Sequence, residues 1–228
     1  GAVEAKEEVN PRYSWFVNKR EDFNAFCGLG HNISVNAGLV KFLNYNEDET
    51  AFVLAHEMVH GQRMHSLSSL PKLVAFSTVA QLYGEKNPNK FSYIMSYIAT
   101  QQLIANYATM PQEREADQNS FLYAVDAGYN PGAGAAVWAK VMAREGDRRG
   151  NFFETVLNPN DHPSNAEREA YFSQRMTEYA GGMVEVSGGA IIVAGDQWLI
   201  PAKTEDMAPA ERAYFIAGNL ARVFHDKQ

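Results

Sequence analysis

The chain of 228 residues is long enough for one domain, or for one domain with a small addition. Its 46% hydrophobic and 21% charged residues are typical of a globular protein and exclude a disordered or fibrous chain. A net charge of −7 argues against nucleic acid or an anionic membrane as a partner. No stretch reaches the ~18 consecutive apolar residues of a transmembrane helix, and the single cysteine, Cys27, excludes an internal disulfide.

The N-terminal part of the chain gives weak structural signals. The first 20 residues are charged and predict a short helix or arm. Glycines interrupt residues 24–36, where alternating apolar and polar residues predict a short strand or hairpin, and residues 39–43 predict a helical turn. Because Gly1 replaces an initiating methionine, we expect a processed mature chain of the cell envelope or periplasm, or a secreted one, although a cleaved tag leaves the same residue.

Helices dominate the middle of the chain. Asn46 is a plausible N-cap for a helix over residues 46–65, with Glu49 three residues later. Ser164 begins a capping box for a helix over residues 164–179. Prolines and glycines delimit the remaining predicted helices, which cover residues 71–83, 91–109, 112–127 and 131–144.

The pattern changes after Gly181. Apolar residues punctuated by glycines predict a hairpin over residues 184–200, and residues 210–225 predict a final amphipathic helix. We therefore divide the chain into a main domain, residues 1–181, and a hairpin-helix appendage, residues 182–228. The expected fold class is α+β, mainly helical, with a small β-sheet.

The string HEMVH at residues 56–60 carries the clearest chemical signal. Two histidines four residues apart lie on one face of a helix, so both can reach one zinc ion at ~2.1 Å. Glu57 projects beside such a metal, where it can take a proton from a bound water. A solvated helix face is the alternative. However, the apolar neighbours predict a buried helix, in which unpartnered histidines would be costly and a metal is the simplest compensation.

A catalytic zinc site needs a third protein ligand. The acidic run at Glu113, Glu115 and Asp117 is the best candidate. Glu113 and Asp117 share a helix face, so one carboxylate can bind metal while the other holds a histidine. Spacing alone does not choose Glu113 over Glu115, and acidic runs on helices are usually solvated.

Three motifs occur in order along the chain: HEMVH, the later Glu113-x-x-x-Asp117 pair, and His162-Pro163-Ser164 with Arg168. This ordered set resembles metallopeptidase family 48, which includes HtpX and the CAAX prenyl proteases. Residues 24–39 and Gly128-Tyr129-Asn130-Pro131 are also similar to soluble members. The resemblance covers roughly residues 20 to 180 and implies a minigluzincin-like zinc-protease domain.

The resemblance implies roles for the metal site. One zinc ion per chain would be held by His56, His60 and Glu113. Glu57 would be the general base and then the proton donor to the leaving amine. Asp117 would support a ligand histidine.

The resemblance also implies roles for residues near a later loop. His162 would stabilise the oxyanion or occupy the zinc as a self-inhibiting ligand, and Arg168 would hold its loop by an ion pair. From the residues alone, the alternatives are an exposed loop histidine at position 162 and a surface arginine at position 168.

A strand near residues 31–36 would form the upper rim of the cleft, with a small mixed sheet behind it. An extended peptide substrate would add to this strand by backbone pairing. The alternative is a strand that only covers the core. The residues expected to bind substrate are Asn24, Ala25, Ile33, Ser34 and Val35.

The function implied by the resemblance is zinc-dependent endopeptidase activity on unfolded or misassembled polypeptides, through a metal-activated water. One alternative is a latent protease blocked by His162, Cys27 or residues 182–228. Another is a zinc-containing chaperone or binding module without turnover. Cys27 is otherwise expected to be a buried apolar residue, and His65, five residues after His60, to be structural.

Overall fold

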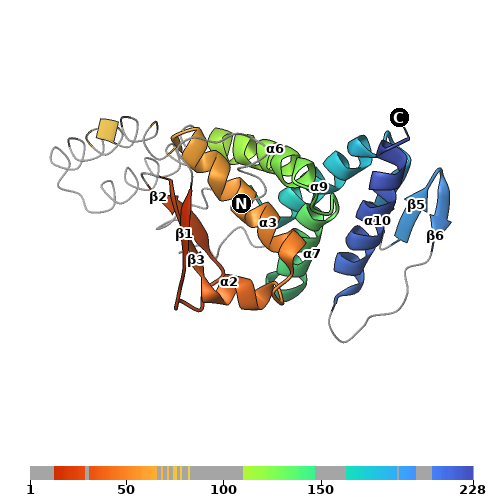
Figure 1. Cartoon of the computed structure of the whole chain (residues 1–228), viewed down its shortest axis with the longest axis horizontal. Helices are drawn as coiled ribbons and strands as arrows, with labels where there is room; N and C mark the ends of the chain where they lie inside the picture. The colour runs from red at the N-terminus through yellow and green to blue at the C-terminus, as the bar shows by residue number, and fades with distance from the viewer. Residues whose placement is uncertain are drawn as a thin grey trace.

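A computed structural model shows an α+β chain that is mainly helical, which confirms the expected fold class (Figure 1). The structure describes residues 13–28, 31–65, 68, 71, 74, 75, 78, 82, 110–146, 163–188, 190–198 and 207–227. The helix predicted over residues 91–109 and the predicted site residue His162 lie outside these ranges. None of the described helices is both long and apolar enough to cross a membrane.

A three-stranded mixed sheet forms the N-terminal part. It contains β1 (Ser14–Asn18), β2 (Ala25–Gly28) and β3 (Asn32–Asn36) in the order β1-β3-β2. β1 runs parallel to β3, and β2 runs antiparallel to it. The expected helix or arm is therefore wrong for β1, whose aromatic and β-branched residues favour a strand once β3 is available as a partner. The short helix α2 (Ala37–Phe42) follows β3 directly.

Four long helices build the centre of the molecule, and their limits agree with the predicted ones to within three residues. The Asn46 side chain accepts a hydrogen bond from the Glu49 N–H, which confirms the predicted N-cap. The predicted capping box between Ser164 and Glu167 is also present. The helices are α3 (Glu47–Gln62), α6 (Met110–Asp126), α7 (Ala133–Glu145) and α9 (Asn165–Tyr179).

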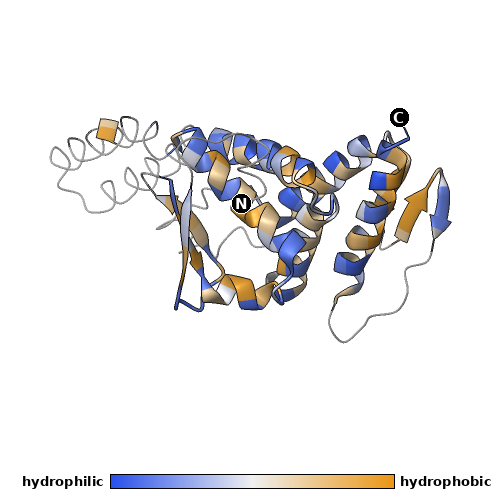
Figure 2. Ribbon diagram, viewed as in Figure 1, coloured by the Kyte–Doolittle hydropathy of each residue, from blue (hydrophilic) through white to orange (hydrophobic). Residues whose placement is uncertain are grey.

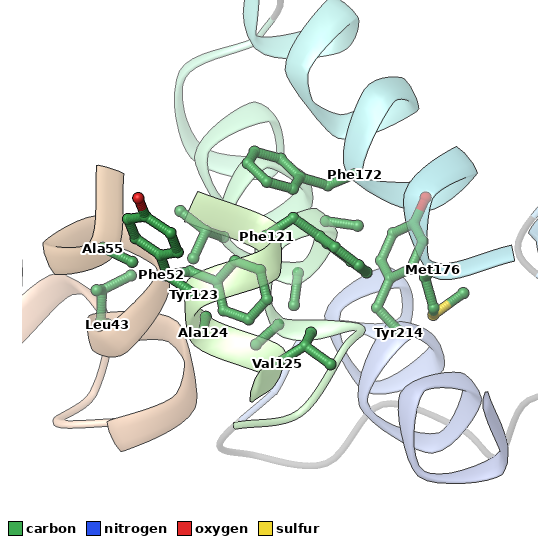
Figure 3. Packing of buried hydrophobic residues seen from close by; sticks show 14 of the residues in the cluster. Leu43, Phe52, Ala55, Phe121, Tyr123, Ala124, Val125, Phe172, Met176 and Tyr214 are labelled. Carbon is green, nitrogen blue, oxygen red and sulfur yellow. The ribbon is translucent and has the colours of Figure 1, made fainter. Parts of the chain in front are cut away.

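The hydrophobic core lies where these helices meet (Figure 3). Phe52 on α3 meets Phe121 on α6 and Phe172 on α9 edge to face, with ring centroids 6.0 and 5.9 Å apart. Such aromatic pairs stabilise the contact beyond their buried area. The β1-β3-β2 sheet packs on α3, away from α7 and α9 (Figure 1).

The C-terminal part adds a second sheet and a last helix. β4 (Val184–Ser187), β5 (Ala190–Val193) and β6 (Asp196–Trp198) form an antiparallel meander, one strand more than the expected hairpin. β5 is apolar along its length, whereas the edge strand β6 is mostly hydrophilic (Figure 2). The predicted final helix is confirmed as α10 (Pro209–His225).

α10 packs closely against the central helices. Tyr214 and Ala217 belong to the same hydrophobic cluster as the core of α3 and α6. A Cβ atom on Gly218 would lie 1.8 Å from Oδ1 of Asn130, so only glycine fits this contact. The Asn130 N–H donates to Asp48 Oδ1 over 2.8 Å, which connects α10 to the start of α3. The predicted boundary near residue 181 stays a prediction.

A buried ionic cluster joins α3, α7 and α10. The Lys140 ammonium donates to Glu49 Oε2 at 2.6 Å and to Glu211 Oε1 at 2.8 Å. Glu49 is fully buried, and its Oε1 has no hydrogen-bond partner. Burial raises the pKa of Glu49 to about 7, although the Lys140 charge opposes the rise. One ammonium therefore faces two carboxylates, and Glu49 binds a proton more readily than in the unfolded chain.

The raised pKa of Glu49 predicts a dependence of stability on pH. In the unfolded chain Glu49 titrates near its ordinary pKa of about 4.3, so between that pH and about 7 the folded state binds more protons. The free energy of unfolding should therefore fall as pH rises from 5 to 8, and Glu49→Gln should flatten this decline. Urea unfolding of both proteins across this range tests it. Glu47→Gln, on the exposed side of the same helix, should leave the slope unchanged, and an equal slope in Glu49→Gln would contradict the prediction.

Candidate functional site

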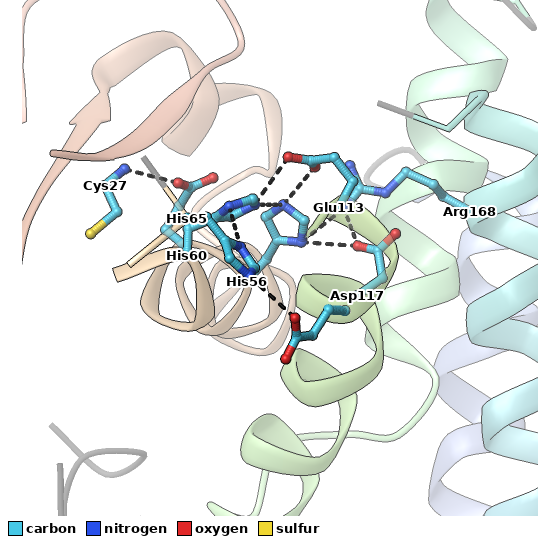
Figure 4. A network of polar contacts seen from close by, with 9 residues as sticks. Cys27, His56, His60, His65, Glu113, Asp117 and Arg168 are labelled. Carbon is cyan, nitrogen blue, oxygen red and sulfur yellow. Dashed lines mark hydrogen bonds and ion pairs between the residues drawn. The ribbon is translucent and has the colours of Figure 1, made fainter. Parts of the chain in front are cut away.

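Three predicted ligands meet where α3 lies beside α6 (Figure 4). His56 and His60 stand one turn apart on α3, and Glu113 comes from the first turn of α6. The two Nε2 atoms are 3.1 Å apart. Glu113 places one carboxylate oxygen 3.2 Å from His56 Nε2 and the other 3.1 Å from His60 Nε2.

These three residues fit a transition-metal ion. Two imidazole nitrogens and a carboxylate are donors that zinc accepts, and one atom from each lies within 4.8 Å of the others. Tetrahedral zinc with bonds of ~2.1 Å needs donor atoms roughly 3.4 Å apart, close to the separations seen here. The carboxylate of Glu115 faces elsewhere, so the structure favours Glu113 over Glu115.

Asp117 and Arg168 contact His56 at Nδ1, the ring nitrogen that does not face Glu113 (Figure 4). The Asp117 Oδ1 atom lies 2.9 Å from His56 Nδ1. Arg168 pairs with Asp117 and stacks over the Trp138 ring, with 4.0 Å from its guanidinium carbon to the ring centroid. Arg168 Nη2 also lies 3.1 Å from Nδ1, but it donates to Asp117. The Asp117 carboxylate is therefore the acceptor that keeps a proton on Nδ1 and leaves Nε2 to face Glu113. The structure thus places Asp117 against a candidate ligand histidine, whereas Arg168, expected to hold the loop of His162, pairs with Asp117.

The electrostatics of this group depend on its two carboxylates. Burial and the Arg168 charge act to lower the pKa of His56, but hydrogen bonds to Asp117 and Glu113 outweigh them and raise it to about 9. Burial acts to raise the pKa of Asp117, but Arg168 and His56 hold it below its usual value. A metal ion would therefore displace a proton from His56, and its affinity falls as pH is lowered.

Glu57 lies beside the three candidate ligands and faces the first sheet. Its Oε2 accepts a hydrogen bond of 2.9 Å from the Cys27 N–H of β2. Gly61 permits this approach, because a Cβ there would lie 2.8 Å from the Cys27 sulfur and from the Tyr13 ring. A main-chain donor thus fixes the carboxylate of the predicted base.

The position of the expected edge strand needs a correction. β3 lies in the middle of its sheet, with both edges paired, so a peptide cannot add to Ile33, Ser34 or Val35 by backbone pairing. Strand order depends on distant residues, so local alternation could not show this. The edge that faces α3 belongs to β2. Ala25 shares the outward-facing side of that edge with Cys27, because directions alternate along a strand.

Two further predicted residues have different outcomes. Asn24 lies just before β2, and its carbonyl accepts from the Asn36 N–H, so it faces β3 rather than the open edge. Cys27 is buried, and burial together with the Glu57 charge raises its pKa to about 11. The thiol therefore stays neutral, which supports the expected apolar packing role rather than a metal-blocking thiolate.

Sequence reasoning placed His65 away from the ligands, but the structure places it against His60. The two Nδ1 atoms lie 3.0 Å apart, and His65 Nε2 lies 3.3 Å from Oε2 of Glu115. Burial and the neighbouring His60 lower the pKa of His65. A five-residue spacing gives no signal for this contact, because on a continuous helix it points to another face.

Comparisons with known proteins agree with this geometry. Residues 2–175 match Peptidase family M48. The chain is also similar to the mitochondrial metalloendopeptidase OMA1 of Arabidopsis thaliana, with 26% identity over 155 residues. That match covers 66% of this chain but 29% of the relative, so the chain spans less than a third of its length. Because the family match covers most of the chain and includes the three candidate metal ligands, the chain belongs to peptidase family M48.

Proposed function

We propose that the chain is a zinc-dependent endopeptidase that cleaves unfolded or misassembled polypeptides. The observation that carries the proposal is the cluster of His56, His60 and Glu113, with the Glu57 carboxylate beside it. Two histidines and one carboxylate favour zinc among the divalent metals. The name of the Arabidopsis relative, a metalloendopeptidase, supports cleavage within a chain. The substrate class is inferred from the resemblance alone.

His56, His60 and Glu113 would hold the metal, which when bound would supply Lewis-acid polarisation of the scissile carbonyl and of a water. Glu57 would take the proton of the attacking water and deliver it to the departing amine. The Cys27 N–H keeps one carboxylate oxygen of Glu57 in place. The β2 edge at Ala25 would orient the substrate by backbone pairing. The oxyanion role of His162 stays a prediction, as does a location in the cell envelope.

The role of Glu57 can be separated from metal binding. Glu57→Gln removes the proton acceptor but no metal ligand, so zinc content should stay at about one per chain. Cleavage of fluorescent casein should fall by about 10²–10⁴-fold, the usual contribution of a general base. Glu47→Gln provides a matched control on the exposed first turn of α3.

Two outcomes would contradict the proposal. Equal casein cleavage by Glu57→Gln and wild type would show that Glu57 is not the general base. Protection of an unfolded client without any cleavage, unchanged by Glu57→Gln, would instead favour a chaperone or binding module.

Asp117 provides a second test, directed at the metal. Asp117→Asn removes the negative charge that holds the Nδ1 proton of His56, so zinc affinity should fall by about 10- to 100-fold. Competition with a chromophoric chelator measures the dissociation constant, and circular dichroism checks the fold. Asp126→Asn changes an exposed carboxylate at the end of the same helix and should have no effect. An unchanged constant in Asp117→Asn would show that Asp117 does not support the site.

A further inference from the structure

His60 contacts a line of polar side chains behind the candidate site (Figure 4). Its Nδ1 lies 3.0 Å from Nδ1 of His65, which is 5% exposed, and the two rings meet edge to face. His65 Nε2 lies 3.3 Å from Glu115 Oε2, and Glu115 Oε1 pairs with Arg63 Nε at 3.0 Å. The line therefore runs from a partly buried candidate ligand to a half-exposed carboxylate.

The backbone at the end of α3 produces this contact. On a continuous helix, His65 would lie about 140° around the axis from His60. Met64 adopts a left-handed conformation, with φ +52°, immediately after Arg63 closes the helix. This conformation is uncommon for a residue other than glycine, and the Met64 side chain itself is exposed. The turn at Met64 returns the chain toward the helix, and His65 comes to lie against His60.

Only one arrangement of protons satisfies this line when His60 binds a metal. His60 Nε2 faces Glu113 and His56, so it must be unprotonated to act as a ligand, and its proton then resides on Nδ1. That N–H donates to Nδ1 of His65. The His65 proton must then be on Nε2, where it donates to the Glu115 carboxylate.

From this geometry we propose that His65 and Glu115 are a positioning pair that fixes the ring orientation and the metal-binding tautomer of His60. This inference rests on the proposed metal site and names a role for residues outside the ligand set. It gives each ligand histidine its own support: Asp117 contacts His56 directly, and Glu115 acts on His60 through His65. Because the side chain of Glu115 is 43% exposed and that of Asp117 is 5% exposed, His60 is held less firmly.

The test compares two substitutions at position 65. His65→Phe keeps an aromatic ring but removes the acceptor, and should weaken zinc binding by about 10- to 100-fold in chelator competition. His65→Gln restores an acceptor and a donor, and should recover most of the affinity. A purely structural role would lower the melting temperature of both variants without this difference. His225→Phe, at a histidine on α10, controls for the loss of an imidazole.

Two further measurements test the positioning role of His65 and Glu115. In the zinc-loaded wild type, ¹⁵N NMR should show the His60 proton on Nδ1 and the His65 proton on Nε2. Glu115→Gln, at a half-exposed position that should not disturb folding, should weaken zinc binding in the same direction but less. A wild type that binds one zinc while His65→Phe and Glu115→Gln bind equally well would overturn the positioning role alone. A wild type without zinc affinity would overturn the metal site and this role together.

Discussion

The side-by-side contact of α3 with α6 is the constraint on which the rest of the site depends. One helix can present two histidines, but a carboxylate that meets both must come from another element. Glu113, Asp117 and Phe121 are spaced by four residues, so they share one face of α6. Phe121 packs on Phe52 of α3 and fixes the rotation of α6 about its axis. A small rotation would therefore withdraw both carboxylates from the histidines together.

Buried charge is balanced differently in the two ionic clusters of the described residues. In the cluster of Lys140 one ammonium serves two carboxylates, and Glu49 compensates by holding a proton. Between α3 and α6, the Arg168 guanidinium pairs with Asp117, and hydrogen bonds to Asp117 and Glu113 favour a proton on His56, which adds a second positive charge. A divalent cation can replace that proton, whereas no comparable donor set surrounds Glu49 among the residues that the structure describes. The same shortage of positive charge thus makes stability depend on pH at the start of α3, and it favours metal binding near the end of that helix.

Sequence reasoning succeeded where local rules determine the structure. The caps at Asn46 and Ser164 and the shared face of His56 and His60 follow from spacing within one helix. The choice of Glu113 over Glu115 depends on which face of α6 meets α3, so it came from the family resemblance rather than from spacing. The left-handed conformation of Met64 could not be predicted, because the residues that usually signal it are glycine and asparagine.

Strand order in the first sheet was also beyond prediction, because it depends on pairing between segments that are far apart in the sequence. Alternation predicted a short strand or hairpin over residues 24–36, which β2 and β3 form, but it did not predict that β1 pairs with β3 from the other side. Which strand is at the edge decides which backbone groups a substrate can reach. That property belongs to the assembled sheet, and no single strand carries it.

The close seating of α10 also limits what shortened proteins can reveal. The family match ends at residue 175, yet Glu211, Tyr214 and Gly218 complete contacts made by α3, α7 and the turn at Asn130. A protein ended near residue 181 would leave apolar surface in water and Lys140 with one partner fewer. Inactivity of such a fragment would therefore indicate a damaged core. Only a gain of activity would show that the C-terminal segment restrains proteolysis.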